Sequence, residues 1–232
     1  NGNMGESYLL SFQYSPNAIV GALKDQGDLL IGELIHQTVH AFSKLNHANE
    51  YFGQEGINRW AQAAYNIAAW DAWAKSLGQP VWKLLGGSRK PVPAYGSGGW
   101  ISYTKEELLE EVQGYKASGF KAVKIKVGKP DWQEDLERLN WVREAVGPHL
   151  NIMMDANQGM TVPAALALAR AAREIGIQWF EEPIDHADFE GYSVLRNQAG
   201  ISLAMGEREY SCLPLRELLK RNAIDIWQPD IL

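Results

Sequence analysis

Short apolar runs alternate with amphipathic stretches along the second half of the chain. The apolar runs cover residues 92–95, 122–127, 152–155, 179–181, 203–207 and 224–227, and the amphipathic stretches include residues 105–117, 132–146, 162–174 and 213–221. Strands and helices that alternate at this pace are typical of a parallel α/β sheet. We therefore predict an α/β domain with six strands.

The first part of the chain has a different pattern. Between Gly56 and Leu77, apolar residues recur at three- and four-residue spacing, which indicates an amphipathic helix. Residues 1–20 are mixed in character and include a candidate strand at 8–12. We predict a mostly helical domain over residues 1–88 and a catalytic (β/α) domain over residues 89–232.

Three acidic residues end consecutive apolar runs at a constant period. Asp155, Glu181 and Glu207 follow one another by 26 residues. One strand–helix unit of a (β/α) barrel takes about 30 residues, and a closed barrel needs about eight strands. We therefore expect two more strands after Leu232 and interpret the chain as a piece of a longer polypeptide. An open doubly wound sheet also fits six strands, but no G-x-G-x-x-G follows the first strand, which disfavours an NAD-linked enzyme.

These three acids are candidate metal ligands. The carboxyl ends of parallel strands meet at one mouth of a barrel, where active sites are built. Carboxylates that converge there repel one another unless a cation lies between them. Oxygen ligands suit Mg²⁺, with Mn²⁺ as an alternative. The competing interpretation is that each acid caps the helix after it, and the shared period favours the metal.

A pair of lysines lies in the second predicted strand. Lys124 and Lys126 are two residues apart, so both side chains point to the same face. Two ammonium groups inside a barrel indicate a functional role, because burying charge is costly. We expect mutual repulsion and a nearby metal to lower the pKa of both, so that one can act as a base. Solvated lysines on an edge strand are the alternative.

Composition narrows the class of protein. The chain is 46% hydrophobic and 22% charged with a net charge of −6, as in ordinary globular proteins, and it has no Lys/Arg cluster that would indicate nucleic-acid binding. No run of about 18 apolar residues predicts a membrane span, and no signal segment opens the chain. Cys212 is the only cysteine, so a reducing cytoplasm is the default expectation.

At these residues the sequence resembles the enolase superfamily, specifically its mandelate racemase subgroup. The resemblance covers nearly the whole chain, because residues 68–75, 80–81 and 84–87 are similar to the family's capping domain. The barrel motifs that match are Lys-Ile-Lys at 124–126, Met-Asp-Ala-Asn-Gln at 154–158, Trp-Phe-Glu-Glu-Pro at 179–183, Gly-Glu at 206–207 and Gln-Pro-Asp at 228–230.

The resemblance implies a role for each matching residue. Asp155, Glu181 and Glu207 would hold Mg²⁺. Lys126 would be the general acid/base on one face of the substrate's α-carbon, and Lys124 would contact the substrate carboxylate and depress the pKa of Lys126. Asn157 would contact the metal or the substrate, and Asp230 would belong to a His–Asp dyad serving the opposite face. Taken alone, Asp230 after a proline is also a common turn residue, and Glu182 is more consistent with a structural role.

Two departures from the family pattern matter. None of the five histidines follows the sixth predicted strand, so the partner of Asp230 is expected past Leu232 or is absent; the five are His36, His40, His47, His149 and His186. The family's first strands and a loop that closes over substrate are expected before Asn1. The sixth strand has no lysine and the third acid is a glutamate, which favours the mandelate racemase branch over the muconate-lactonizing one.

The resemblance implies removal of the proton α to a carboxylate through an ene-diolate stabilised by Mg²⁺. The reaction we expect is dehydration of an acid sugar, an aldonate or aldarate, to a 2-keto-3-deoxy acid. The alternatives are a racemase or epimerase of a 2-hydroxy acid and an inactive homologue that serves as a binding protein. A small carboxylate substrate and a homo-oligomer are implied in the same way.

Overall fold

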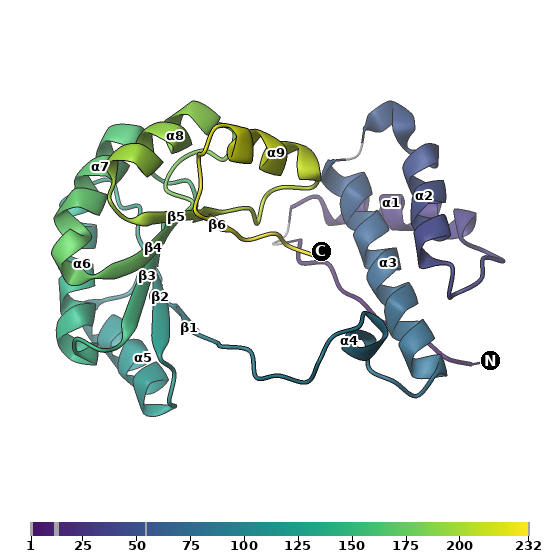
Figure 1. Cartoon of the computed structure of the whole chain (residues 1–232), viewed down its shortest axis with the longest axis horizontal. Helices are drawn as coiled ribbons and strands as arrows, with labels where there is room; N and C mark the ends of the chain where they lie inside the picture. The colour runs from purple at the N-terminus through teal and green to yellow at the C-terminus, as the bar shows by residue number, and fades with distance from the viewer. Residues whose placement is uncertain (1, 12–13, 54, 232) are drawn as a thin grey trace. The chain divides into compact units, whose positions relative to one another are not determined.

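The computed structural model describes residues 2–11, 14–53 and 55–231. They form two compact units, one ending at Pro91 and one running from Val92 to Asp230. The first is helical, and the second is a parallel sheet with helices (Figure 1). None of the helices in the described ranges combines the length and the apolar character needed to cross a membrane.

The helical unit is built around its longest helix, α3. Its elements are α1 (Pro16–Leu29), α2 (Thr38–Ala48), η1 (Glu50–Phe52), α3 (Gly56–Ser76) and α4 (Val81–Leu84). Small buried side chains on α3, such as Ala61 and Ala64, let the neighbouring helices approach closely. The Tyr65 hydroxyl ties α3 to α1 by donating to the Leu23 carbonyl at 2.6 Å.

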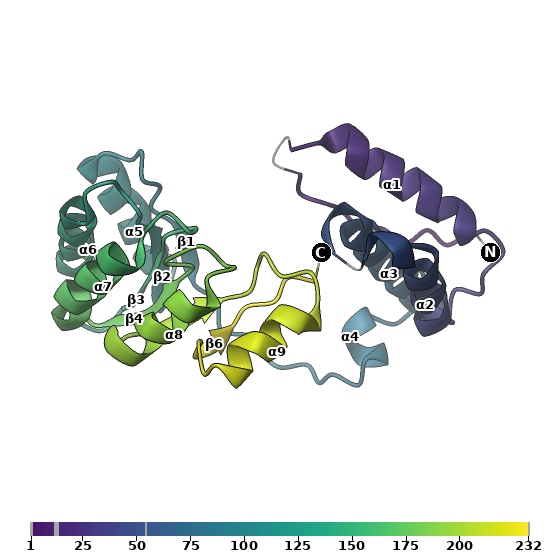
Figure 2. The same ribbon diagram turned by 90° about the horizontal axis from the view of Figure 1, so that it is seen from above.

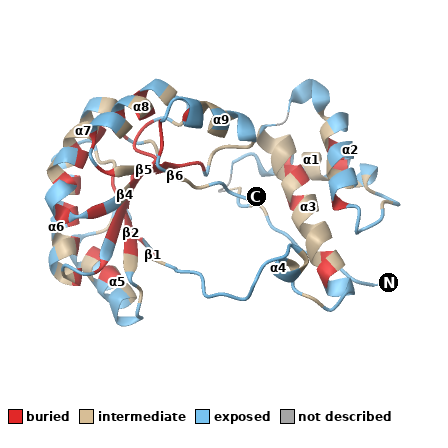
Figure 3. Ribbon diagram, viewed as in Figure 1, coloured by how far each residue is buried: buried red, intermediate tan, exposed pale blue. Residues whose placement is uncertain are grey.

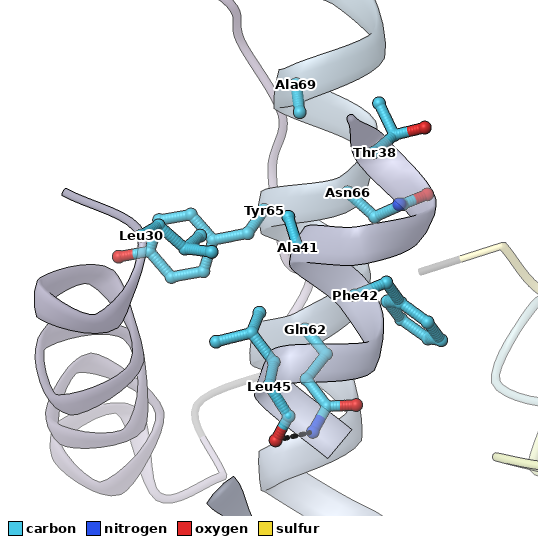
Figure 4. A pocket seen from close by; sticks show the side chains of 9 residues that line it. All are labelled: Leu30, Thr38, Ala41, Phe42, Leu45, Gln62, Tyr65, Asn66 and Ala69. Atoms are coloured by element: carbon cyan, nitrogen blue, oxygen red, sulfur yellow. Dashed lines mark hydrogen bonds between the residues drawn. The ribbon is translucent and has the colours of Figure 1, made fainter. Parts of the chain in front are cut away.

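A small cavity lies in this unit, mainly between α2 and α3 (Figure 4). Its volume of about 30 Å³ accommodates one or two water molecules. Gln62 lines it and donates to the Leu45 carbonyl at 3.4 Å. None of the predicted site residues borders this cavity.

The strand expected at residues 8–12 is not formed over residues 8–11, and residue 12 lies outside the described part. The preceding residues instead make side-chain contacts with α3. The Glu6 amide donates to Asp71 at 2.9 Å, and the Ser7 hydroxyl donates to the Ala64 carbonyl at 2.8 Å. These bonds tie Glu6 and Ser7 to α3 in place of a partner strand.

The second unit holds a six-stranded sheet in which strands are ordered as they occur in the chain, all parallel. The strands are β1 (Gly96–Gly98), β2 (Ala122–Lys126), β3 (Asn151–Asp155), β4 (Ile177–Glu181), β5 (Ser202–Met205) and β6 (Ile226–Trp227). The helices are α5 (Lys105–Ala117), α6 (Trp132–Val146), α7 (Val162–Ala171) with η2 (Ala172–Ile175), α8 (Phe189–Gln198) and α9 (Cys212–Lys220). This arrangement confirms the predicted α/β class.

The helices cover one face of the sheet, as Figure 2 shows from above. Alternate strand residues, including Val123, Ile125, Met154 and Phe180, pack against them in a continuous hydrophobic core. The strands are largely buried, whereas the outer sides of the helices are exposed (Figure 3). Because side chains alternate along a strand, the residues between these core positions point to the opposite face of the sheet.

The first strand lies later in the chain than predicted. Residues 92–95 form no strand, and β1 begins at Gly96, whose register partner is Val123. Pro93 lacks an N–H group to donate to a ladder. Glycine is favoured at the start of β1, because a Cβ added at Gly96 would lie 2.3 Å from the ring of Tyr115.

Candidate active site

The two lysines and two of the three acids meet on the face of the sheet opposite the helices. Lys126, Asp155 and Glu181 are direct register partners on β2, β3 and β4. The Lys124 ammonium contacts Glu181 Oε1 at 2.5 Å and Asp155 Oδ2 at 3.3 Å. The Lys126 ammonium donates to Asp155 Oδ2 at 2.5 Å. The structure therefore brings together four residues that are up to 57 positions apart in the sequence.

This cluster is deeply buried. The side chain of Asp155 is 0% exposed and that of Lys124 is 9% exposed. Burial alone would raise the pKa of Asp155, but the charge of Lys124 and the hydrogen bond from Lys126 hold it below its ordinary value of 3.8. Buried charges at this density are stable only because they are paired.

With the acids free of metal, the pKa of Lys124 is raised rather than lowered. Burial pushes this pKa down, but the negative charges of Asp155 and Glu181 outweigh burial, so the pKa of Lys124 lies well above its ordinary value. The expectation from the sequence rested on repulsion by Lys126 and on a nearby metal, whereas here the carboxylates of Asp155 and Glu181 contact Lys124 directly. Lys124 is therefore favoured as a cation in this arrangement, which suits it to binding an anion.

Glu181 has further partners that the sequence reasoning missed. The Gln228 amide donates to Glu181 Oε2 at 2.8 Å, and the Trp179 indole N–H donates to the same oxygen at 3.2 Å. Trp179 lies two residues before Glu181 on β4, so the alternation of side chains could have placed it on this face. Gln228 follows the sixth strand, and only the fold reveals its contact.

Glu207 does not share the register of the other two acids. Glu181 pairs with Ala204 on β5, so Glu207 lies three residues further along the chain, in the turn after the strand. Its side chain is 41% exposed. It accepts a hydrogen bond from Asn157 Nδ2 at 3.3 Å. Across the ranges that the structure describes, no three acidic, histidine or cysteine side chains form a ready metal-binding group.

The structure does not support the alternative in which the three acids cap the helices that follow them. Thr161 caps α7, Asp188 caps α8 and Ser211 caps α9, each through its side chain. The acids at the strand ends are therefore available for another purpose. Asn157 contacts two of them, because its backbone N–H also donates to Asp155 Oδ1 at 2.9 Å.

Asp230 and Glu182 are the other residues that the sequence singled out. Asp230 is exposed and follows β6 by three residues. Glu182 is fully buried and bound by Arg208 Nε at 2.9 Å. Burial and the nearby Glu207 carboxylate raise the pKa of Glu182 to about 7, against the opposing charge of Arg208. Arg208 is a partner that the sequence reasoning missed.

Two protein-family models match the chain. Residues 107–232 match the family model described as enolase C-terminal domain-like, and residues 1–86 match the N-terminal domain of mandelate racemase / muconate lactonizing enzyme. The chain belongs to the mandelate racemase / muconate lactonizing enzyme family of the enolase superfamily. The predicted family is thus confirmed, and the parallel sheet is that of its (β/α)-barrel domain.

Curated relatives in this family are named for acid-sugar chemistry. The chain is 33% identical to the arabinonate dehydratase of Saccharolobus solfataricus, covering 100% of this chain and 63% of that protein. It is 34% identical to the L-talarate/galactarate dehydratase of Salmonella typhimurium, covering 95% of this chain and 57% of that protein. The chain therefore spans about six tenths of the length of these relatives.

Solved structures of family members resemble the chain closely. The L-talarate dehydratase of Polaromonas, complexed with Mg and L-glucarate, has a TM-score of 0.88 and 30% identity, covering 94% of this chain and 61% of that one. An enolase from Bradyrhizobium, complexed with magnesium and mandelic acid, has a TM-score of 0.91 and 26% identity, covering 100% of this chain and 64% of that one.

Proposed function

We propose that the protein is a Mg²⁺-dependent enzyme that removes the proton α to the carboxylate of an acid sugar and eliminates the neighbouring hydroxyl as water. The observation that carries this proposal is the pairing of two ammonium groups from β2 with the carboxylates of Asp155 and Glu181, on the sheet face opposite the helices. The names of the dehydratase relatives support the substrate class.

The residues present fit a divalent cation by their donor chemistry. Asp155 and Glu181 offer carboxylate oxygens in adjacent register, and Glu207 offers a third on the next loop. In the absence of a divalent ion, the lysines balance the negative charge of the first two. Asp155, Glu181 and Glu207 would hold Mg²⁺, which when bound supplies positive charge to the substrate's carboxylate oxygens.

The two lysines have different parts in the proposed reaction. Lys124, a buried cation beside Asp155 and Glu181, binds the substrate carboxylate and stabilises the negative charge that grows there. Lys126 donates to Asp155 as an ammonium group, so it must lose a proton and this contact before its amine can accept the α-proton. The neutral amine takes the α-proton, the electrons of the broken C–H bond form the Cα=Cβ bond of an enol, and the β C–O bond breaks. The Lys126 ammonium formed in this step gives its proton to the departing hydroxyl, which leaves as water. The resulting enol becomes a 2-keto-3-deoxy acid.

The proposal is tested by incubating the protein with Mg²⁺ and a panel of mono- and di-acid sugars and assaying 2-keto acid. In D₂O, Lys126→Ala should lose exchange of the substrate α-proton by at least about 100-fold while still binding Mg²⁺. Lys129→Ala is the matched control, because Lys129 pairs with Glu134 on the loop after β2 and lies outside the cluster. Undiminished exchange in Lys126→Ala at both R and S centres would remove Lys126 from the mechanism.

A racemase is the second candidate, because a solved racemase from Streptomyces coelicolor with bound magnesium resembles the chain with a TM-score of 0.90, 28% identity and coverage of 94% of this chain and 62% of that one. The same panel separates the two reactions. A dehydratase forms keto acid, whereas a racemase inverts the α-carbon without forming it.

A further inference from the structure

The loop after β5 is tied to the two preceding loops by three consecutive side chains. Glu207 accepts from Asn157 at 3.3 Å, Arg208 donates to Glu182 at 2.9 Å, and Glu209 Oε1 lies 2.8 Å from His186 Nδ1. We call these six residues the β5-loop clamp. Each contact joins the loop after β5 to the loop after β3 or to the loop after β4.

Two ties of the clamp join a buried carboxylate to a half-exposed basic side chain. The carboxylate of Glu209 is 4% exposed, and that of Glu182 is fully buried. Their partners His186 and Arg208 are each 39% exposed. Removing His186 or Arg208 leaves a buried carboxyl group without this hydrogen-bond partner, which is costly, so these contacts restrain the loop.

The loops after β3 and β4, which the clamp contacts, contain residues in an unusual backbone conformation. Asn157, Gln158 and Glu182 have positive φ angles of 42°, 67° and 37°, a region that residues other than glycine rarely adopt. The side chains of all three take part in cross-loop bonds, and Gln158 Oε1 accepts from the His186 amide at 2.7 Å. Strained conformations persist where surrounding contacts over-determine them. Here those contacts belong to the clamp or adjoin it.

The clamp bears directly on the third acid. Asp155 and Glu181 are positioned by the ladder of the sheet, whereas Glu207 lies past the end of β5 and has no ladder to place it. Its position depends on the loop that carries it. Arg208 and Glu209, the two residues after it, are the anchors of that loop on neighbouring elements.

We propose that His186 and Arg208 are positioning residues that hold the β5 loop so that Glu207 can share a divalent cation with Asp155 and Glu181. This inference rests on the proposed function and adds to it residues that touch neither metal nor substrate. His186 acts through Glu209, and Arg208 acts through the backbone that it shares with Glu207 and through its side chain, whose Nη2 lies 4.0 Å from Glu207 Oε1. Groups that orient metal ligands typically contribute about 10- to 100-fold to metal affinity.

The test compares Mn²⁺ binding, followed by electron paramagnetic resonance, in three histidine variants. His186→Ala should bind Mn²⁺ at least about 10-fold more weakly than the unmodified protein. His186→Gln should retain most of the affinity, because its amide can still donate to Glu209. His149→Ala is the matched control, since His149 is exposed near the amino end of β3, at the other end of the strand from Asp155. It should bind Mn²⁺ normally.

Hydrogen exchange of residues 206–211 gives a second readout, and these amides should exchange faster in His186→Ala than in His149→Ala. Arg208→Lys, which keeps the charge but loses the Nε donor, should also weaken Mn²⁺ binding. Normal Mn²⁺ affinity in His186→Ala and Arg208→Lys would overturn the clamp while leaving the proposed function intact. Failure of the unmodified protein to bind Mn²⁺ would instead overturn the proposed function and this inference with it.

Discussion

Replacing Lys124 by methionine tests how the buried charges are balanced. Lys124 is the ammonium group that contacts both Asp155 and Glu181, and all three side chains are less than a tenth exposed. Methionine preserves the apolar length of the side chain and removes the charge. The two carboxylates then retain Lys126, Gln228 and Trp179 as donors.

The size of the expected stability loss depends on which carboxylate loses its charged partner. Breaking a buried ion pair costs about 3–5 kcal/mol. Asp155 keeps its contact with Lys126, so the loss is concentrated on Glu181, whose other partners are neutral donors. We therefore expect the low end, about 3 kcal/mol of lost unfolding free energy at neutral pH. For a domain of this size, that corresponds to a fall in melting temperature of about 6–12 °C.

The loss should depend on pH in a defined direction. The pKa of Asp155 is lowered in the folded state, so its ionisation contributes stability above the unfolded value and that contribution disappears as pH falls through the folded value. Part of this contribution comes from Lys124. The stability difference between the unmodified protein and Lys124→Met should therefore be largest near neutrality and shrink below about pH 4.

Urea unfolding at several pH values, without divalent ions, measures this difference. Lys121→Met is the matched control, because Lys121 is exposed just before β2 and lies outside the cluster. It should change stability by less than about 0.5 kcal/mol. Adding Mg²⁺ should recover more stability in Lys124→Met than in the unmodified protein. Equal stability of the two proteins at pH 7, or a difference that grows on acidification, would refute the charge-balance argument.

Three further predictions concern the same unit. EDTA should abolish turnover of the acid-sugar substrate and added Mg²⁺ should restore it, and activity that is indifferent to the chelator would contradict the metal site. Asp135→Ala should lower the free energy of unfolding by about 3 kcal/mol in urea, because the buried carboxylate of Asp135 accepts from the Gly128 and Lys129 amides at 2.8 and 2.9 Å. Burial raises the pKa of Asp135, so the neutral variant Asp135→Asn should lower this free energy by less. Phe180→Ala should cost about 3–5 kcal/mol through the cavity it leaves in the core, with Phe189→Ala, at a partly buried position, costing less.

Much of this protein could be read from local patterns. The alternation of apolar runs and amphipathic stretches predicted the sheet unit, because strand and helix periods are properties of short segments. The two-residue spacing of Lys124 and Lys126 determined that they share a face of β2, and the acids at the ends of β3 and β4 marked the carboxyl side of the sheet. These inferences needed no knowledge of which strand lies beside which.

Only the tertiary structure decided how the segments align. The sequence placed Glu207 at the end of an apolar run, as it did Glu181, but β5 ends at Met205, the β4–β5 register pairs Glu181 with Ala204, and Glu207 lies in the turn. The raised pKa of Lys124 and the cross-loop tie between His186 and Glu209 also depend on neighbours distant in sequence. Strand register and electrostatic environment are set by packing over the whole sheet, so spacing along the chain predicts which residues approach one another but not how they are held.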